Sequence, residues 1–218
     1  MKEYKLPIGC DVPETIILAD GDFPSHPLAL EWLRQCPYVV CCDGAANTYI
    51  RSGRMPEAIV GDGDSLLPDI KERYASLIHS EAEQETNDLS KAFRFCLSQE
   101  RKRITIMGAT GKREDHTIGN VSLLADYMEQ AEVSMMTDYG IFVPIREDSM
   151  FESYIGQQIS VFNMNSTALS AEGLAYPLSV FTNWWQGTLN EALARHFIIR
   201  TEEKTLQGMK SLSIFFIL

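Results

Sequence analysis

Apolar segments and amphipathic segments alternate along the first 140 residues. Strands are predicted where apolar and β-branched residues cluster, at residues 15–19, 38–42, 58–60, 103–107 and 132–137, with a weaker strand at 77–79. Helices are predicted between them, where apolar residues recur at helical spacing, at residues 27–35, 44–52, 68–74, 88–99 and 116–129. This alternation favours an α/β domain with a mostly parallel, Rossmann-like sheet and flanking helices.

The pattern changes after residue 140. Strands are predicted there at residues 141–145, 158–162, 197–201 and 212–218, and a helix is suggested only around Glu191. We therefore expect two domains, an α/β catalytic domain at residues 1–140 and a small all-β, sandwich-like domain at residues 141–218. A chain of 218 residues is long enough to bury both cores.

Aspartate and glycine residues follow the predicted strands. Asp20, Asp43, the segment 61–65 (GDGDS) and the segment 108–113 (GATGKR) each come directly after a strand. In an open parallel sheet, ligands bind beyond the carboxyl ends of the strands. We therefore expect these four segments to share one rim of the sheet.

The acidic residues of this rim predict a magnesium site. Asp62 and Asp64 lie in a glycine-rich loop, and Asp43 and Asp88 each stand at the start of a predicted helix. Magnesium prefers carboxylate oxygens, and a bound cation relieves the repulsion between clustered carboxylates. Helix capping by the same aspartates is the alternative that remains open for each loop taken alone.

Residues 108–113 have the features of a phosphate-binding turn. They supply a glycine-rich backbone, the Thr110 hydroxyl and the cations Lys112 and Arg113 just before a predicted helix. The spacing is not that of a Walker A loop. A plain strand-to-helix connection is the alternative interpretation.

Composition narrows the functional classes. The formal net charge of −11 disfavours broad nucleic-acid binding. Residues 1–14 have no signal or transit pattern and residues 212–218 are too short to span a bilayer, so we predict a cytoplasmic protein without a membrane role. The five cysteines form no CxxC pair and are expected to be reduced core residues, and the four histidines lack zinc-ligand spacing.

These motifs resemble, in the same order, those of the thiamine pyrophosphokinase family. The family pattern has an Asp-Gly-Gly-Ala-Asn-like segment, a GDxDS loop, a Thr-Asp helix start and a GxxGxRxDH segment. The corresponding segments here are residues 43–47, 61–65, 87–88 and 108–116, with a weaker resemblance at 159–162, 172–178 and 190–191. The chain departs from the pattern at Ala45, at Asn87, where threonine is usual, and at residues 188–190, near a serine-asparagine pair of the family.

The resemblance implies an enzyme that transfers diphosphate from ATP to the hydroxyethyl group of thiamine and releases AMP, with magnesium as cofactor. The implied metal ligands are Asp62, Asp64 and Asp88. The expected catalytic residues are Asp43, Asp64, Asp88 and Asp115. Asp43 is expected to hold a metal-bound water or the substrate hydroxyl. The residue that accepts the hydroxyl proton is either Asp115 or an aspartate of the cluster, and this choice stays open.

Substrate-contacting residues are expected from both domains. The residues expected to contact the nucleotide are Asn47, Gln84, Thr110, Gly111, Lys112, Arg113 and His116. Thiamine is cationic and aromatic, so tryptophan faces suit it, and the candidates are Trp184, Trp185, Thr188 and Asn190. Adjacent tryptophans in a strand point to opposite faces, so we expect at least one of the two to serve packing or an interface.

The resemblance also implies a homodimer whose acceptor site lies between the catalytic domain of one subunit and the β domain of the other. Three other interpretations stay open. They are an ATP-dependent diphosphotransferase or nucleotide hydrolase with another acceptor, a non-catalytic sensor of nucleotide or thiamine, and a purely structural protein. The complete set of four aspartates disfavours the last two.

Overall fold

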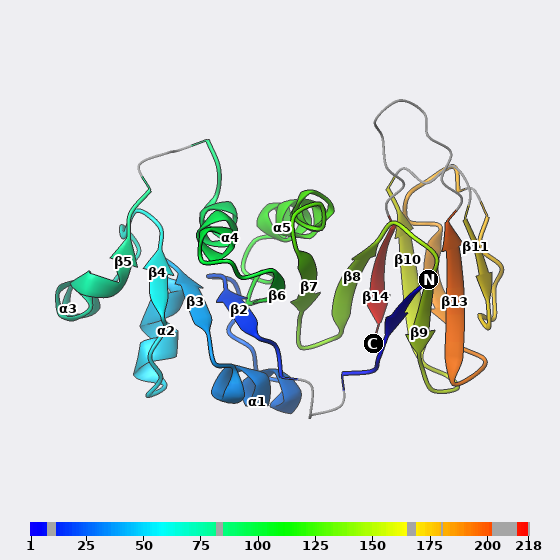
Figure 1. Ribbon diagram of the computed structural model, residues 1–218, viewed down its shortest axis with the longest axis horizontal. Helices are drawn as coiled ribbons and strands as arrows, with labels where there is room; N and C mark the ends of the chain where they lie inside the picture. The colour runs from blue at the N-terminus through cyan, green and yellow to red at the C-terminus, as the bar shows by residue number, and fades with distance from the viewer. Residues whose placement is uncertain (8–11, 82–84, 165–168, 180, 202–212, 218) are drawn as a thin grey trace. The chain divides into compact units, whose positions relative to one another are not determined.

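A computed structural model describes residues 1–7, 12–81, 85–164, 169–179, 181–201 and 213–217, with side chains described up to residue 201 (Figure 1). The chain divides into two compact units, one formed by Gly9–Tyr139 and the other by Met1–Ile8 together with Gly140–Leu218. The first residues of the chain thus belong with the C-terminal unit, whereas the sequence pattern placed them in the N-terminal domain.

The unit Gly9–Tyr139 is a parallel α/β sheet. Its strands are β2 (Thr15–Leu18), β3 (Val39–Cys42), β4 (Ala58–Val60), β5 (Ile78–His79), β6 (Arg103–Met107) and β7 (Glu132–Met136). They pair in the order β7-β6-β2-β3-β4-β5, and every pair is parallel. The strand order reverses direction between β2 and β6, which is the switch point where such sheets bind ligands.

Helices cover both faces of this sheet. They are α1 (Pro27–Gln35), α2 (Ala45–Arg51), α3 (Pro68–Arg73), α4 (Asp88–Ser98) and α5 (Glu114–Tyr127), with a short 3-10 turn, η1, at Ala75–Leu77. Figure 1 shows α1 and α2 on one face and α4 and α5 on the other. Strands β2, β3 and β4 are buried along their whole length, which explains why their sequences are continuously apolar.

The second unit is a β-sandwich. One sheet has the order β1-β9-β13-β11, from Lys2–Tyr4, Ser149–Glu152, His196–Thr201 and Leu169–Glu172. The strands β8 (Ile141–Ile145), β10 (Gln158–Asn163), β12 (Gly187–Glu191) and β14 (Ser213–Ile217) pair in the order β12-β10-β14-β8. Both sheets contribute to one core, in which Phe151 stacks on Tyr4 and on Phe197 at centroid distances of 4.7 and 4.9 Å.

The predicted fold class is confirmed, since a parallel α/β unit is followed by a β-rich one. The suggested helix around Glu191 is wrong, because that residue ends strand β12. Its neighbours pair with β10, and this ladder outweighs a weak local helical preference. Within the described residues, no helix has both the length and the apolar character needed to cross a membrane.

Candidate active site

The predicted rim exists at the carboxyl end of the parallel sheet. Asp20 follows β2, Asp43 follows β3, residues 61–65 follow β4, and residues 108–113 follow β6. We call residues 61–65 the acidic loop and residues 108–113 the glycine loop. Each parallel strand delivers its following loop to the same edge, so the local order of strand and loop is sufficient to gather these residues.

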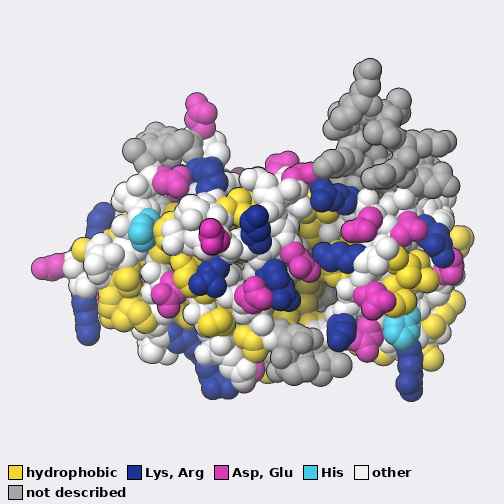
Figure 2. All heavy atoms as spheres, in the orientation of Figure 1, with side chains coloured by type: hydrophobic (Ala, Val, Ile, Leu, Met, Phe, Trp, Pro, Cys, Tyr) yellow, Lys and Arg dark blue, Asp and Glu magenta, His cyan; other side chains and the backbone are white. Residues whose placement is uncertain are grey.

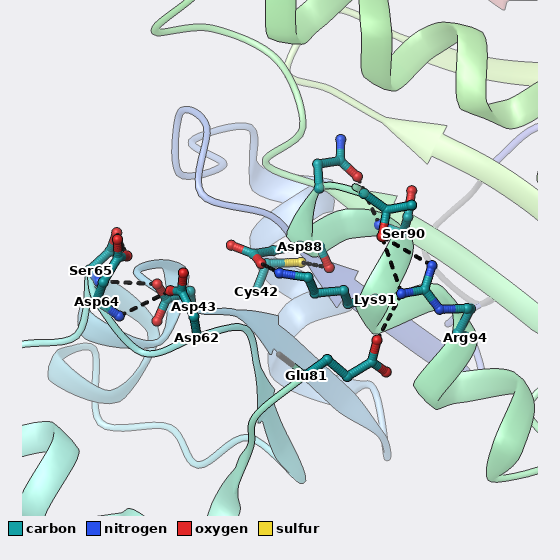
Figure 3. A network of polar contacts seen from close by, with 12 residues as sticks. Cys42, Asp43, Asp62, Asp64, Ser65, Glu81, Asp88, Ser90, Lys91 and Arg94 are labelled. Atoms are coloured by element: carbon teal, nitrogen blue, oxygen red, sulfur yellow. Dashed lines mark hydrogen bonds and ion pairs between the residues drawn. The ribbon is translucent and has the colours of Figure 1, made fainter. Parts of the chain in front are cut away.

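Three carboxylates meet at this rim. Asp43, Asp62 and Asp64 each offer an oxygen within 4.8 Å of the others, and we call these three residues the acidic cluster (Figure 3). Asp43 is 3% exposed, whereas Asp62 and Asp64 are exposed. Oδ2 of Asp43 accepts a hydrogen bond from the Ser65 N–H at 3.1 Å. Oδ1 of Asp43 is buried without a hydrogen-bond partner among the described residues.

Unusual backbone geometry brings the cluster together. Asp43 has φ of 31°, a left-handed conformation that aspartate adopts more readily than most residues. A Cβ atom on Gly61 would lie 2.8 Å from Cβ of Asp43, so only glycine allows the acidic loop to approach this closely. Lys71 then fixes the loop by donating from Nζ to the Gly63 carbonyl at 2.6 Å.

The electrostatics of the cluster favour a bound cation. The pKa of Asp43 is raised to about 6, mainly by burial and also by the neighbouring Asp64, Asp88 and Asp62, while the hydrogen bond from the Ser65 N–H opposes this shift. The pKa of Asp64 is lowered, chiefly because the Ser65 hydroxyl donates a hydrogen bond to its Oδ1 at 3.0 Å. A buried carboxylate oxygen without a partner beside two more carboxylates is a donor set that suits a hard divalent cation such as magnesium.

Asp88 lies outside this cluster. It begins helix α4, and its Oδ1 is 3.0 Å from Nζ of Lys91, whose side chain is 6% exposed (Figure 3). Cys42 Sγ donates to the Asp88 carbonyl at 3.7 Å. The structure therefore groups Asp43 with Asp62 and Asp64, where the sequence pattern had grouped Asp88 with them.

The glycine loop is fixed to the loop that follows β2. The N–H groups of Gly21 and Asp22 donate to the carbonyls of Gly108 and Thr110 at 2.6 and 2.9 Å. Lys112 Nζ donates to the carbonyl and to Oδ1 of Asp20, at 2.9 and 3.0 Å. These bonds join the two loops that flank the switch point between β2 and β6.

The charged groups after Gly111 are exposed at the start of helix α5. Arg113 pairs with Asp115 through Nη2 and Oδ2 at 2.5 Å, and both side chains are more than 60% exposed. Hydrogen bonding with Arg113 lowers the pKa of Asp115 to about 2, so Asp115 is a weak proton acceptor. His116 is exposed, and its N–H donates to Asp115 Oδ1. Figure 2 shows acidic and basic side chains interspersed on one face of the molecule, without an extended basic surface on that face.

Asn47 supports the acidic loop with both ends of its amide. Its Nδ2 donates to the Ser65 carbonyl at 2.8 Å, and its Oδ1 accepts from the Leu67 N–H at 3.0 Å. Asn47 thus holds the acidic loop, and its predicted contact with the nucleotide stays a prediction. Gln84, the other predicted nucleotide contact of this region, lies outside the described residues.

The candidates for thiamine belong to the β-sandwich unit and differ in exposure. Trp184 and Trp185 are 56% and 54% exposed, and Trp184 packs on Phe162 with ring centroids 5.5 Å apart. Thr188 is half-buried. Asn190 is buried, and its amide bonds to both the N–H and the carbonyl of Tyr176, at 3.0 and 2.8 Å. Its role within the unit is therefore to hold the turn at Tyr176.

Two residues of the site region were not singled out by the sequence pattern. Lys91 stands on the buried side of α4, and Asn120 of α5 donates from Nδ2 to the Ala109 carbonyl at 2.8 Å. A lysine among the apolar positions of α4 was the available signal for the first. Nothing in the local pattern marks the second, because its partners are distant in sequence.

Two family models match this chain. One is described as thiamin pyrophosphokinase, catalytic domain, and matches residues 29–136, and the other as thiamin pyrophosphokinase, substrate-binding domain, and matches residues 140–207. Thiamine pyrophosphokinase 1 of Oryza sativa subsp. japonica is 30% identical over 129 residues, which cover 48% of this chain and 49% of that protein. Thiamine pyrophosphokinase of Bacillus subtilis (strain 168) is 34% identical over 86 residues, covering 38% and 40%. The chain spans about half the length of the curated relatives it matches.

Solved structures share the fold across nearly the whole chain. Thiamine pyrophosphokinase from Bacillus subtilis matches with a TM-score of 0.75 and 20% identity, over 93% of this chain and 98% of that one. Thiamin pyrophosphokinase from Candida albicans matches with a TM-score of 0.74 and 17% identity, over 100% and 93%. With a catalytic-domain match over the parallel sheet and a substrate-binding-domain match over the sandwich, the chain belongs to the thiamin pyrophosphokinase family.

Proposed function

We propose that this protein is a thiamine diphosphokinase, which transfers diphosphate from ATP to thiamine and yields thiamine diphosphate and AMP. The observation that carries this proposal is the acidic cluster, in which one Asp43 oxygen is buried and has no hydrogen-bond partner in the described part of the chain. It lies on the same rim as the fixed glycine loop that bears Lys112 and Arg113. Carboxylates and cations gathered on one rim suit a substrate that brings both a divalent metal and phosphates.

We propose Asp43, Asp62 and Asp64 as the residues that would hold magnesium. When bound, the metal would neutralise charge on the phosphate oxygens. This set replaces Asp88 with Asp43 relative to the sequence-based expectation, because Asp43 lies within 4.8 Å of the other two carboxylates and Asp88 is paired with Lys91.

The chain's own residues would bind and orient the nucleotide. Arg113 and Lys112, with backbone groups at Thr110 and Gly111, would contact the phosphates. In the reaction, the thiamine hydroxyl oxygen forms a bond to the β-phosphorus, the bond from that phosphorus to the oxygen bridging it to the α-phosphorus breaks, and AMP leaves. The hydroxyl proton passes to a carboxylate, and Asp115, whose pKa is lowered to about 2, is a weak acceptor, so we propose an aspartate of the acidic cluster for this role.

We propose that one of the two exposed tryptophans stacks on thiamine. Trp184 already packs on Phe162, so Trp185 is the stronger candidate. Trp185→Ala should then raise KM for thiamine more than Trp184→Ala does, with KM for ATP unchanged in both. A larger effect of Trp184→Ala would reverse this assignment.

The family resemblance also leads us to propose a homodimer with acceptor sites shared between subunits. Mixing an Asp64→Asn subunit with a Trp185→Ala subunit should then restore part of the activity. Failure of all mixtures to recover activity, with dimers demonstrated by sedimentation, would argue against shared sites.

The experiment that tests the function is incubation of the purified protein with ATP, magnesium and thiamine while AMP and thiamine diphosphate are quantified together. Equal amounts of the two products, both lost in Asp64→Asn, support the proposal. AMP without thiamine diphosphate favours a second candidate, a diphosphotransferase with another acceptor. That candidate is kept because residues 188–190 depart from the family pattern and place Leu189, 80% exposed, at φ of 60°.

A further inference from the structure

The glycine loop is held from two sides. On one side it bonds to Gly21, Asp22 and Asp20, as described above. On the other side its attachment is Asn120, whose Nδ2 donates to the Ala109 carbonyl at 2.8 Å. Asn120 belongs to α5, so this bond connects the loop to the body of the helix that follows it.

Asn120 is itself held by the helix that carries Asp88. Its Oδ1 accepts a hydrogen bond from Nδ2 of Asn87 at 3.1 Å. Asn87 is the N-cap of α4, and its Oδ1 accepts from the Ser90 N–H at 3.0 Å. A continuous series of three hydrogen bonds therefore runs from the first turn of α4, through Asn87 and Asn120, to the glycine loop. We call it the amide bridge.

The two helices provide a firm base for this bridge. Ser90 Oγ and the Tyr127 hydroxyl lie 2.8 Å apart in a buried position, and the rings of Phe93 and Tyr127 stack with centroids 3.9 Å apart. Asn120 precedes Tyr127 by two helical turns, so both residues lie on the face of α5 that meets α4. The amide bridge continues this contact from the buried helix interface to the rim of the site.

We propose that Asn120, together with Asn87, is a positioning residue that sets the glycine loop relative to Asp88 and thereby prepares the loop for nucleotide phosphates. The nucleotide part of this inference rests on the proposed function. The family pattern has threonine at position 87. A threonine hydroxyl also caps a helix, but its oxygen stands one bond closer to the main chain than Nδ2 of Asn87. A hydroxyl held at the Ser90 N–H is therefore not extended toward Asn120, whereas the asparagine amide offers a separate acceptor and a separate donor, so the bridge is specific to asparagine at this position.

Three variants and one control test the bridge. Asn120→Ala removes the two bonds that Asn120 makes, to Asn87 and to the Ala109 carbonyl. Asn87→Thr keeps the helix cap but replaces the amide that reaches Asn120 by a shorter hydroxyl, and the double variant combines the two changes. Ser122→Ala, on the same helix, removes only an exposed bond to the Gly119 carbonyl and serves as the control. The readouts are KM for ATP, KM for thiamine, kcat, and amide hydrogen exchange of the glycine loop in the protein without substrates.

We expect Asn120→Ala to raise KM for ATP about fivefold, the factor that corresponds to the net free energy of about one hydrogen bond. The kcat and the KM for thiamine should change less. Exchange of the glycine-loop amides should become faster by a similar factor. Adding Asn87→Thr to Asn120→Ala should have little further effect, because the bond it removes is already absent.

The outcomes separate this inference from the proposed function. Fully additive effects of the two changes, an equal rise in KM for ATP in Ser122→Ala, or unchanged loop exchange in Asn120→Ala would each overturn the bridge. If the wild-type protein forms no thiamine diphosphate, the proposed function fails. Faster, non-additive loop exchange in the variants would then still support the bridge, and unchanged exchange would overturn it.

Discussion

Nζ of Lys91 lies 3.0 Å from Oδ1 of Asp88, in a helix where the Lys91 side chain is only 6% exposed and that of Asp88 is 34% exposed. The buried Lys91 ammonium group offsets the negative charge of the Asp88 carboxylate, which would otherwise have no counter-charge in this pair. Removing one partner of such a pair leaves the other without its counter-charge, which costs more than the pair itself contributes.

We therefore expect Lys91→Met, which keeps the apolar stem, to lower the free energy of unfolding by about 2 kcal/mol, less than for a fully buried pair because Asp88 is partly solvated. Urea denaturation measures this. Arg34→Met is the matched control, since Arg34 forms an i,i+3 pair with Glu31 on α1 while 60% exposed, and it should leave the stability nearly unchanged. Equal effects of the two substitutions would contradict the role assigned to burial.

Asp43→Asn should have opposite effects without and with metal. The folded-state pKa of Asp43, about 6, lies above its ordinary value of 3.8, so its contribution to stability is fully present below pH 3.8 and is lost as the pH rises through about 6. At pH 7.5 in EDTA, the neutral asparagine should raise the free energy of unfolding by about 1–3 kcal/mol.

With magnesium, the wild-type protein should be more stable than Asp43→Asn. Magnesium should raise the thermal midpoint of the wild-type protein and have a much smaller effect on Asp43→Asn, because one of three proposed ligands is then neutral. Thermal unfolding at several pH values, with EDTA and with magnesium, measures both effects. A variant that is less stable than the wild type in EDTA would show that Asp43 carries no unrelieved charge.

Arg113→Gln should reduce kcat/KM for ATP by roughly 100-fold, the scale of a lost charged donor to a transferring phosphoryl group. The thermal midpoint should not change, because the Arg113–Asp115 pair is exposed. Steady-state kinetics with varied ATP measure the effect. The matched control is Arg103→Gln, an equally exposed arginine paired with Glu14, whose kinetics should stay at the wild-type level.

Asn190→Ala should act mainly on stability. It leaves the N–H and the carbonyl of Tyr176 without their side-chain partner inside the sandwich unit, so we expect a loss of about 2 kcal/mol in urea denaturation. Asn183→Ala, at an exposed position of the same unit, should cost less than about 0.5 kcal/mol. A large rise in KM for thiamine at unchanged stability would instead make Asn190 a substrate contact, as its sequence position had suggested.

The local pattern of the sequence determined the parallel sheet and the rim. Continuous apolar runs such as Thr15–Leu18 form strands that are buried on both faces, and each is followed by the loop that carries its polar residues. Because parallel strands end at one edge, the order of strand and loop alone places Asp43, the acidic loop and the glycine loop together. This inference needs no long-range information.

The identity of the cluster required the tertiary structure. Whether Asp43 or Asp88 joins Asp62 and Asp64 depends on the left-handed backbone at Asp43 and on the close approach of Gly61 to its Cβ. Strand β1 is a similar case. Lys2–Tyr4 has no apolar run, and it is fixed by pairing with Ser149, Met150 and Phe151, from which the whole of Gly9–Tyr139 separates it in the sequence.

The hydrogen-bond partners of the asparagines also required the tertiary structure. Their sequence positions showed polar side chains near a site, but only folding decided that Asn47 bonds to Ser65 and Leu67 and that Asn190 bonds to Tyr176. Local periodicity determines which residues form a strand or helix, because neighbours along the chain set backbone preference and burial. The partner of a polar side chain depends on which distant segment packs against it, and that is decided only when the whole domain has folded.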